Sequence, residues 1–253
     1  MYDRSWAELP AASGNNAYTE EYSKCVKLFT YNSKTYRNYS MCYDTKRYVA
    51  RWVAYPMHSC YTGGDNDSET FYQDPSFPSS EQITETYAGS TYNRGHQIAK
   101  AQRKVTAEAR KQTNYYTNMT PQNSTLNGGK WATMEAKERE GWMCSDTLYV
   151  VSGCHFDNYN TTCANNDGKS CPVPTHYFKV MLRTKDGNTG KKVQECSASE
   201  LICGGYWVEN AAATPQFKSV TEIEALTGFK FFVNVPNAPK STKASEFEIV
   251  FSN

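Results

Sequence analysis

The stretch that decides the fold reads YNRGHQ at residues 92–97, and NMTPQ follows it at residues 118–122. The first stretch holds Arg94 and His96, and the second begins with Asn118. A histidine suits general-base chemistry at neutral pH because its unperturbed pKa is about 6.5. An arginine beside it can stabilise the negative charge that develops on a phosphate. These residue types together predict a site that hydrolyses phosphodiester bonds.

The second stretch leads into an expected helix over residues 120–141, with Thr120 as its N-cap. Asn127 offers a neutral amide oxygen on that helix, and Mg²⁺ prefers hard oxygen ligands and keeps most of its water. Glu135 lies two turns further along and could accept hydrogen bonds from that water. Arg139 could hold phosphate, or it could pair with Glu135 on a solvated helix surface.

Net charge gives no case for a nucleic-acid partner, since 27 basic and 26 acidic residues leave the chain at +1. Any steering of a polyanion must come from a local patch. Basic residues gather between positions 94 and 111, either to follow a phosphate backbone or as a solvated helix face. We expect substrate contacts from Lys100, Arg103 and Lys104, together with Arg51. The local set is Arg94, Lys100, Arg103, Lys104, Arg110 and Lys111, opposed by Glu108.

The hydrophobic pattern indicates an α+β fold with a central antiparallel sheet. The hydrophobic content of 39% is enough for a packed core, and no repeat or linker divides the chain. We therefore expect one domain over residues 1–253, with a loosely structured lead-in at 1–23 and a long loop at 61–82. The expected strands are 26–31, 47–55, 147–153, 176–183, 206–208 and 231–236, and the expected helices are 104–112, 120–141 and 219–226.

The nine cysteines are unusually many for a cytosolic enzyme of this size. They predict an oxidising compartment, disulfide-stapled loops and one odd thiol, with a connectivity that sequence does not reveal. A zinc site is the alternative, although its spacing matches no finger or ribbon well. Its ligands would be Cys154, His155, Cys163 and Cys171.

The predicted location is secreted or periplasmic. Residues 1–6 are polar and do not form a signal peptide, so we expect the export leader to have been removed and Met1 to be an added start. The sequence has no apolar run of about 18 residues or more, which predicts no membrane-spanning helix. It leaves the oligomeric state open.

The site residues together resemble the DNA/RNA non-specific endonucleases of the ββα-metal (His-Me finger) type, the Serratia nuclease-like family. The similarity spans roughly residues 45–236. The family usually reads Asp-Arg-Gly-His where this chain has Asn93 in the first position. The matching positions are Arg94, Gly95, His96, Asn118, Pro121, Gln122, Asn127, Trp131, Glu135 and Arg139.

The resemblance implies a ββα-metal core and a role for each of these polar side chains. His96 would be the general base, with Asn118 supporting it. Asn127 would bind Mg²⁺ directly, with Mn²⁺ or another divalent ion able to substitute, and Glu135 would orient a metal-bound water. Arg94 and Arg139 would hold phosphate. The partners would be DNA and RNA, bound through their backbones, and the products would carry 5′-phosphates.

Two departures from the family pattern affect these expectations. Asn93 replaces an acidic residue, which can change metal affinity or second-sphere orientation. The family often carries a further arginine in the loop before the core, whereas the loop around Asp74 has none, so Arg51 or Lys100 would take its place. Two alternatives follow: a catalytically weak or inactive secreted binding protein of the same fold, and a phosphodiesterase for small nucleotides.

Overall fold

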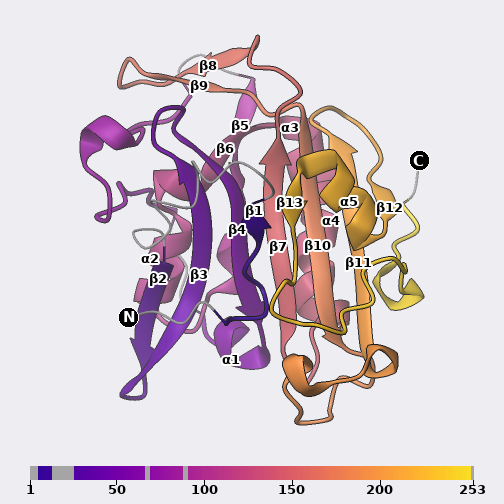
Figure 1. Ribbon diagram of the computed structural model, residues 1–253. Helices are drawn as coiled ribbons and strands as arrows, with labels where there is room; N and C mark the ends of the chain where they lie inside the picture. The colour runs from indigo at the N-terminus through magenta and orange to yellow at the C-terminus, as the bar shows by residue number, and fades with distance from the viewer. Residues whose placement is uncertain (1–4, 13–25, 66–68, 88–90, 252–253) are drawn as a thin grey trace.

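The computed structural model describes residues 5–12, 26–65, 69–87 and 91–251. Its centre is a seven-stranded sheet in the order β12-β11-β10-β7-β4-β3-β2, and every neighbouring pair in it is antiparallel (Figure 1). The predicted α+β class with a central antiparallel sheet is confirmed. The strands are β2 (Val26–Tyr31), β3 (Lys34–Asp44), β4 (Val49–Met57), β7 (Leu148–His155), β10 (His176–Thr184), β11 (Leu201–Glu209) and β12 (Gln216–Lys218).

The central strands are the ones whose sequences are apolar on both sides. Every residue of β4 is buried, as is expected when both faces of a sheet are covered. β11 is longer than predicted because two glycines interrupt its apolar pattern. A Cβ on Gly205 would lie 2.5 Å from Ile223 Cδ1, so the missing side chain lets a helix pack closely on the strand.

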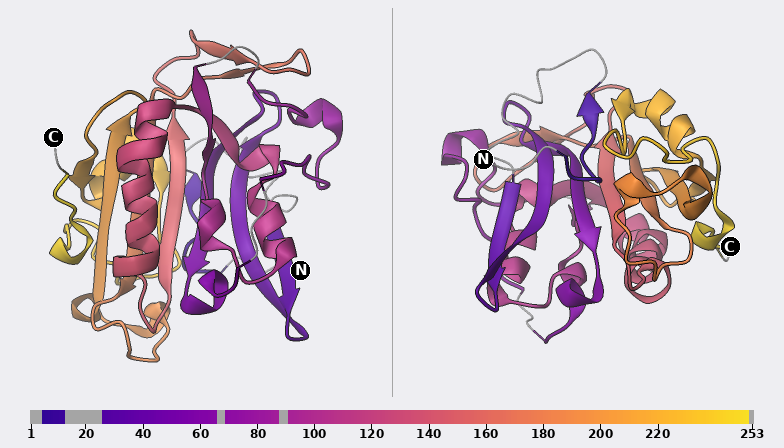
Figure 2. Two further views of the ribbon diagram at one scale, coloured as in Figure 1. Left: turned by 180° about the vertical axis from the view of Figure 1, so that it is seen from behind. Right: turned by 60° about the horizontal axis from the view of Figure 1, so that its bottom comes forward.

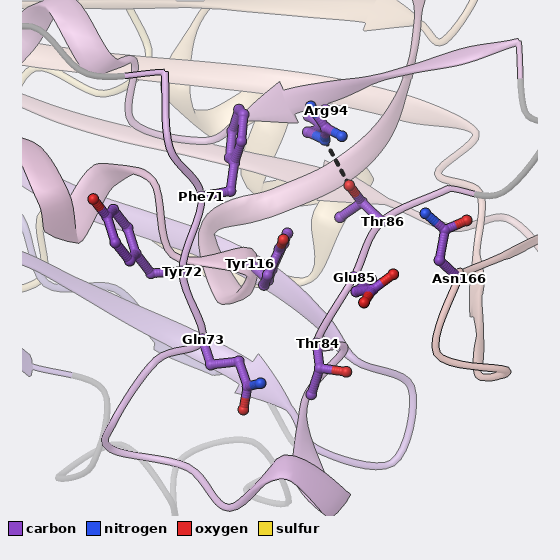
Figure 3. A pocket seen from close by; sticks show the side chains of 9 residues that line it. All are labelled: Phe71, Tyr72, Gln73, Thr84, Glu85, Thr86, Arg94, Tyr116 and Asn166. Carbon is purple, nitrogen blue, oxygen red and sulfur yellow. Dashed lines mark hydrogen bonds between the residues drawn. The ribbon is translucent and has the colours of Figure 1, made fainter.

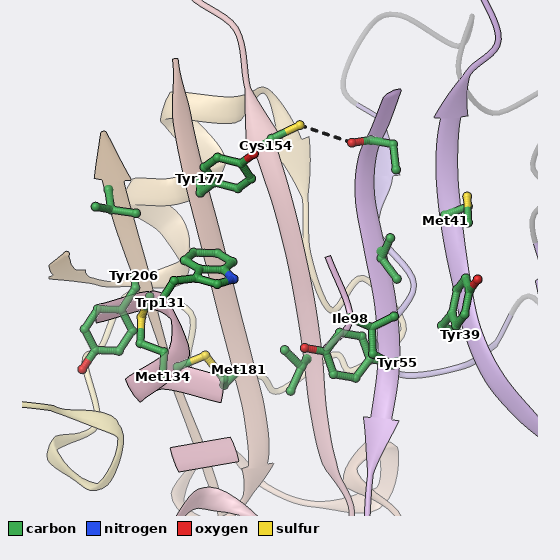
Figure 4. Close-up of a cluster of buried hydrophobic side chains, with 14 of the residues drawn as sticks. Tyr39, Met41, Tyr55, Ile98, Trp131, Met134, Cys154, Tyr177, Met181 and Tyr206 are labelled. Atoms are coloured by element: carbon green, nitrogen blue, oxygen red, sulfur yellow. Dashed lines mark hydrogen bonds between the residues drawn. The ribbon is translucent and has the colours of Figure 1, made fainter. Parts of the chain in front are cut away.

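Helices cover the two faces of the sheet. A helical stretch over residues 124–142 covers one face, and α5 (Val220–Thr227) covers the other (Figures 1 and 2). The stretch comprises α3 (Ser124–Leu126) and α4 (Ala132–Lys137), each followed by a π-helical segment. Its Trp131 and Met134 are fully buried in the core beside Tyr177 and Tyr206 (Figure 4).

A two-stranded hairpin precedes this helical stretch. It pairs β5 (Tyr92–His96) with β6 (Met119–Asn123), and α2 (Ala107–Thr113) lies between the two in sequence. The prediction of a helix start at Thr120 is wrong. Pro121 has no N–H to donate, but a strand of a two-stranded hairpin tolerates it, and here it stands opposite Arg94. Asn123 caps the helix instead, because its Oδ1 accepts from the amides of the two residues that follow Ser124.

The ends of the chain also depart from expectation. Residues 231–236 form no strand; β13 (Phe229–Lys230) is the strand there, and it pairs with β1 (Ala11–Ala12). The expected lead-in therefore packs on the fold where it is described: Ala7 and Leu9 are buried, and Glu8 forms a 2.6 Å ion pair with Arg37. Residues 1–4 and 13–23 of that segment lie outside the described residues.

The cysteines do not staple the described loops. No disulfide bond joins two of the eight described cysteines, so the predicted stapling is not found among them, and Cys25 lies outside the described residues. β8 (Thr162–Ala164) and β9 (Ser170–Pro172) place Cys163 opposite Cys171. Among the described residues no three of His, Cys, Asp and Glu are grouped to hold a metal, so the zinc alternative gains no support.

The helix α1 (Ser59–Thr62) is a single turn that follows β4. Within the described part of the chain, no helix combines the length and apolarity needed to cross a membrane.

Candidate active site

One pocket of about 390 Å³ lies where β5 meets the start of the helical stretch. It brings together predicted residues from segments that are far apart in sequence. His96 and Arg94 come from β5, Lys100 from the short turn that follows β5, and Asn127 and Glu135 from the helical stretch. The full lining is Phe71, Asn93, Arg94, His96, Ala99, Lys100, Asn127 and Glu135.

His96 ends β5, and the close packing of the hairpin fixes its position. A Cβ on the preceding Gly95 would lie 2.5 Å from Gln122 Cβ, so only glycine lets the two strands approach this closely. The imidazole Nε2 lies 3.1 Å from Asn114 Oδ1. Asn114 Nδ2 donates to the carbonyl of Thr70 at 3.0 Å, which turns its oxygen towards the histidine. From this acceptor we assign the proton of the neutral imidazole to Nε2, which leaves the lone pair on Nδ1.

Burial lowers the pKa of His96 to about 4. The hydrogen bond to Asn114 acts in the opposite direction, while the positive charges of Arg110 and Lys100 lower the pKa further. The side chain is consequently neutral at physiological pH. A neutral imidazole is the form that can accept a proton from water.

Asn118 supports the residues that follow the histidine. Its Oδ1 accepts from the amide of Ile98 at 3.1 Å, and its Nδ2 donates to the carbonyls of Ile98 and Thr113 at 2.9 and 2.8 Å. Its own carbonyl accepts from the amide of Gln97 at 3.0 Å. The fully buried Asn118 thus joins the end of β5 to the end of α2, without lining the pocket itself.

Asn127 and Glu135 supply the hard oxygen atoms of the pocket. The Asn127 side chain forms no hydrogen bond to another described residue, so its amide oxygen is available to a ligand. Burial raises the pKa of Glu135 to about 7; nearby Lys179 and Arg139 lower it, and Glu138 raises it. An amide oxygen and a carboxylate that line the same pocket fit a hard divalent cation that keeps most of its water.

A network of buried polar and charged side chains bonds to the backbone of the helical stretch at Glu135. Glu138, one turn later, forms a 2.7 Å ion pair with Lys179 of β10 and accepts hydrogen bonds from Tyr55 and Gln102 at 2.9 Å each. The side-chain oxygen of Gln102 accepts a hydrogen bond from Arg139 Nη1 at 2.9 Å, and the same nitrogen donates to the backbone carbonyl of Glu135. Arg139 therefore braces the helical stretch beside the pocket but does not line it.

Arg94 extends from the hairpin across the mouth of the pocket. Its Nε donates to Thr86 Oγ1 at 2.6 Å, and its guanidinium lies 4.5 Å from the centre of the Phe71 ring. With Nε engaged, its terminal nitrogens are the ones left to contact a phosphate.

Three of the four predicted substrate-binding residues are not brought to the pocket. Arg103 is fully buried, and its guanidinium donates to Asn38 and to the carbonyls of Pro56 and Gln102. Arg51 is largely buried and donates to Tyr159 at 2.8 Å. Lys104 lies after the turn and outside the lining, whereas Lys100 is in place and pairs with Glu69.

Sequence reasoning missed three residues of the site: Phe71, Asn114 and Gln102. Phe71 lies in a loop whose composition gave no sign of its position. Asn114 and Gln102 act through contacts between segments that are distant in sequence, at 18 and 37 residues from their partners His96 and Arg139. A polar residue at the end of a predicted helix was the available signal for Asn114.

The fold is similar to that of a solved nuclease. The structure titled "Crystal structure of the EndoG/EndoGI complex: Mechanism of EndoG inhibition" aligns with a TM-score of 0.62 at 22% identity, covering 85% of this chain and 91% of that one. At this identity the likeness shows the fold alone.

Curated relatives match over most of the chain. Mitochondrial nuclease EXOG of Mus musculus is 28% identical, over 89% of this chain and 63% of its own length. Human mitochondrial endonuclease G is 27% identical over 81% of this chain and 69% of its own length. Nuclease C1 of Cunninghamella echinulata var. echinulata is 28% identical over 77% and 80%. The chain thus spans just under two thirds of the length of the EXOG relatives.

These relatives correct one prediction. The EXOG proteins of Mus musculus, Xenopus laevis and Homo sapiens are named mitochondrial nucleases, not secreted or periplasmic ones. The predicted secreted or periplasmic location is therefore wrong. The inference of secretion from the cysteine count required disulfide bonds, and none joins two of the described cysteines.

The predicted family membership is confirmed by a family model. The model for DNA/RNA non-specific endonucleases matches residues 22–238, which include both stretches of the pocket. Its members and the relatives above are named as nucleases, which are phosphodiester hydrolases. The chain belongs to the DNA/RNA non-specific endonuclease family.

Proposed function

We propose that the protein is a Mg²⁺-dependent endonuclease that hydrolyses DNA and RNA and leaves 5′-phosphates. The observation that carries the proposal is the single pocket that His96, Arg94, Asn127 and Glu135 share. A hairpin followed by a helix supplies all of them, which is the arrangement expected of a ββα-metal site.

His96 is the proposed general base. Its Nδ1 takes a proton from a water molecule as the water oxygen attacks phosphorus, and the bond from phosphorus to the 3′ oxygen breaks on the opposite side. The phosphate remains on the 5′ oxygen of the downstream fragment, and the released 3′ oxygen takes a proton from water and becomes the 3′ hydroxyl of the upstream fragment. Asn114 keeps the imidazole in the required tautomer, and Asn118 holds the backbone that follows it.

Asn127 and Glu135 would hold the divalent cation, Asn127 directly and Glu135 through the water around it. The cation would act as a Lewis acid towards the phosphate and the leaving oxygen. Arg94 offers terminal N–H groups to the non-bridging phosphate oxygens, and Lys100 adds positive charge at the same pocket. Arg139 contributes by bracing Glu135.

Recognition of phosphate by Arg94 and Lys100 carries no sequence information, because phosphates are the same at every step of the chain. This supports cleavage of both nucleic acids with little sequence preference. Ribose would be tolerated because the proposed attack uses water and not the 2′ hydroxyl.

Plasmid cleavage is the direct test. Purified protein is incubated with supercoiled DNA, and separately with RNA, in Mg²⁺ with and without a chelator. The His96→Ala variant is expected to lose cleavage, whereas His176→Ala, which removes a partly buried imidazole stacked on Trp207 outside the pocket, is the matched control. Cleavage by His96→Ala at the parental rate would overturn the proposal.

Metal placement and product ends need separate measurements. Asn127→Ala is expected to abolish Mg²⁺-dependent cleavage, and the exposed Asn160→Ala is its control. Product ends are read by ligation with and without prior kinase treatment, and 5′-phosphates ligate without it. A dinucleotide cleaved faster than a polymer would favour the small-phosphodiester alternative instead.

A further inference from the structure

A second pocket lies directly beside the active-site pocket and shares a wall with it. Its volume is about 530 Å³, and Phe71 and Arg94 line both hollows. Tyr116, which begins the short turn leading to Asn118, also lines it (Figure 3). The rest of the lining is Tyr72, Gln73, residues 84–86 and Asn166. None of the roles proposed above for phosphate, water or cation uses this space.

Flat aromatic surfaces form one side of the second pocket. The rings of Phe71 and Tyr116 are stacked, with centroids 6.3 Å apart and planes within 20° of parallel. The guanidinium of Arg94 extends the stack from Phe71, and Phe71 also lies 6.1 Å from the ring of His96. Both aromatic side chains are partly exposed, and neither belongs to a hydrophobic core cluster of the described residues. Every nucleobase can stack on such a surface.

The opposite side of the pocket is polar and carries a negative charge. Thr86 is occupied by Arg94, while the side chain of Glu85 is exposed at the rim (Figure 3). A second phosphate would be repelled by this carboxylate. An uncharged ring with amino groups would not be repelled, since carboxylates accept hydrogen bonds from exocyclic amines of bases.

We propose that this pocket is a nucleobase subsite, which holds one unstacked base of a nucleotide that adjoins the scissile phosphate. The inference rests on the proposed function, because it places the phosphate in the neighbouring pocket. Arg94 links the two: its guanidinium continues the aromatic stack and its terminal nitrogens reach the phosphate. A base can enter the pocket only after it leaves a duplex stack, so single-stranded or locally open substrate is favoured.

The test uses Tyr116→Ala, with Tyr116→Phe as the matched control that keeps the ring. The substrate is a short single-stranded oligonucleotide with one cleavable linkage between nuclease-resistant linkages. It is made with both adjoining bases present, or with either one replaced by an abasic residue. Loss of one stacking contact should lower kcat/KM of Tyr116→Ala about tenfold on the complete substrate. Tyr116→Phe should remain near the parental value.

Combining the Tyr116→Ala variant with an abasic substrate then separates loss of stacking from a general effect on the fold, because two changes that remove the same contact have non-additive effects on kcat/KM. One of the two abasic substrates should slow the parent enzyme about tenfold and should not slow Tyr116→Ala any further. If Tyr116→Ala lowers kcat/KM relative to the parent by the same factor on the complete and the abasic substrates, Tyr116 has only a structural role. The proposed subsite is then wrong. Equal cleavage of all substrates by the parent would also overturn it.

A doubly abasic substrate, in which both residues that adjoin the cleavable linkage are abasic, distinguishes this outcome from failure of the proposed function, because this phosphodiester places no aromatic ring in the subsite. Tyr116→Ala should hydrolyse it at the parental rate, and His96→Ala should not. If the parent protein cleaves neither this substrate nor the complete oligonucleotide, the proposed function itself fails. If the parent cleaves both and Tyr116→Ala matches it on every substrate, the subsite alone fails.

Discussion

Burial shifts the pKa values of two ionisable side chains of the pocket in opposite directions. The pKa of His96 falls to about 4 and that of Glu135 rises to about 7. In the cation-free protein, stability should therefore rise with pH from about 4 to 6.5 through His96 and fall from about 4.5 to 7 through Glu135. The base is already neutral where the carboxylate is only beginning to ionise.

Mg²⁺ affinity is expected to depend on the ionisation of Glu135 and not on that of His96. Below pH 7 the affinity should fall by up to about tenfold per pH unit, because binding requires the ionised carboxylate, and above pH 7 it should level off. Calorimetric titration from pH 5 to pH 8 measures this. Glu135→Gln should bind weakly at every pH, and equal affinity of the parent at pH 5 and pH 8 would contradict the prediction.

Asn114 is expected to act on the rate through the tautomer of His96. Asn114→Leu removes the acceptor for Nε2–H and should lower kcat by roughly tenfold to a hundredfold with little change in KM. Asn114→Asp keeps the acceptor and adds a negative charge, so it should raise the pKa of His96 and move the acid limb of the kcat profile to higher pH. A higher KM with an unchanged kcat in Asn114→Leu would contradict this role.

At the scale of elements, the hairpin and the helical stretch use glycine for different reasons. Gly95→Ala places a Cβ 2.5 Å from Gln122 Cβ, between paired strands that cannot separate, and should cost roughly 1–3 kcal/mol. Gly128→Ala enters open space in the helical stretch and should be neutral or stabilising by up to about 1 kcal/mol. Urea unfolding measures both, and equal effects would contradict the assignment. Only Gly95→Ala should also reduce cleavage, because His96 follows it.

The kink in the helical stretch at the glycine pair 128–129 could not be predicted from the sequence. Two glycines inside an expected helix would be explained by close approach of a strand, yet neither glycine has a neighbour within 4 Å of its missing Cβ. Gly129 instead adopts non-helical dihedral angles, with φ −113° and ψ −109°, where the helical stretch kinks. Hydrophobic periodicity and composition predict a helix here. They do not predict the π-helical segment and the kink that lie between Asn127 and Glu135.

Strands with continuous apolar sequences were predictable, and contacts across the chain were not. β4 and β10 were found near their expected bounds because their burial follows directly from composition. The motif also identified His96, Asn127 and Glu135 as residues of one pocket. Arg103 and the hairpin strand β6 were misjudged, because the sequence cannot show that a basic side chain satisfies buried carbonyls or that a Thr-Pro pair lies in a strand.

At the scale of the whole molecule, charge is sparse where substrate would lie. Of the basic residues between positions 94 and 111, Arg103 and Arg110 are buried, and only Arg94 and Lys100 line the pocket. A net charge of +1 adds no long-range attraction for a polyanion. Binding must therefore depend on a few contacts at the site and, if the subsite is correct, on stacking that salt does not screen.

Affinity for nucleic acid should accordingly depend only weakly on salt. Two phosphate contacts give a slope of about −2 in a plot of log affinity against log salt concentration for duplex DNA. Fluorescence anisotropy with the His96→Ala protein, from about 50 to about 200 mM NaCl at constant Mg²⁺, measures the slope without cleavage. Arg94→Ala should reduce its magnitude by about 1, while Lys192→Ala, an exposed cation paired with Glu195, should leave it unchanged. A slope steeper than about −5 would mean that a broad basic surface follows the backbone, which a pocket with two cations cannot provide.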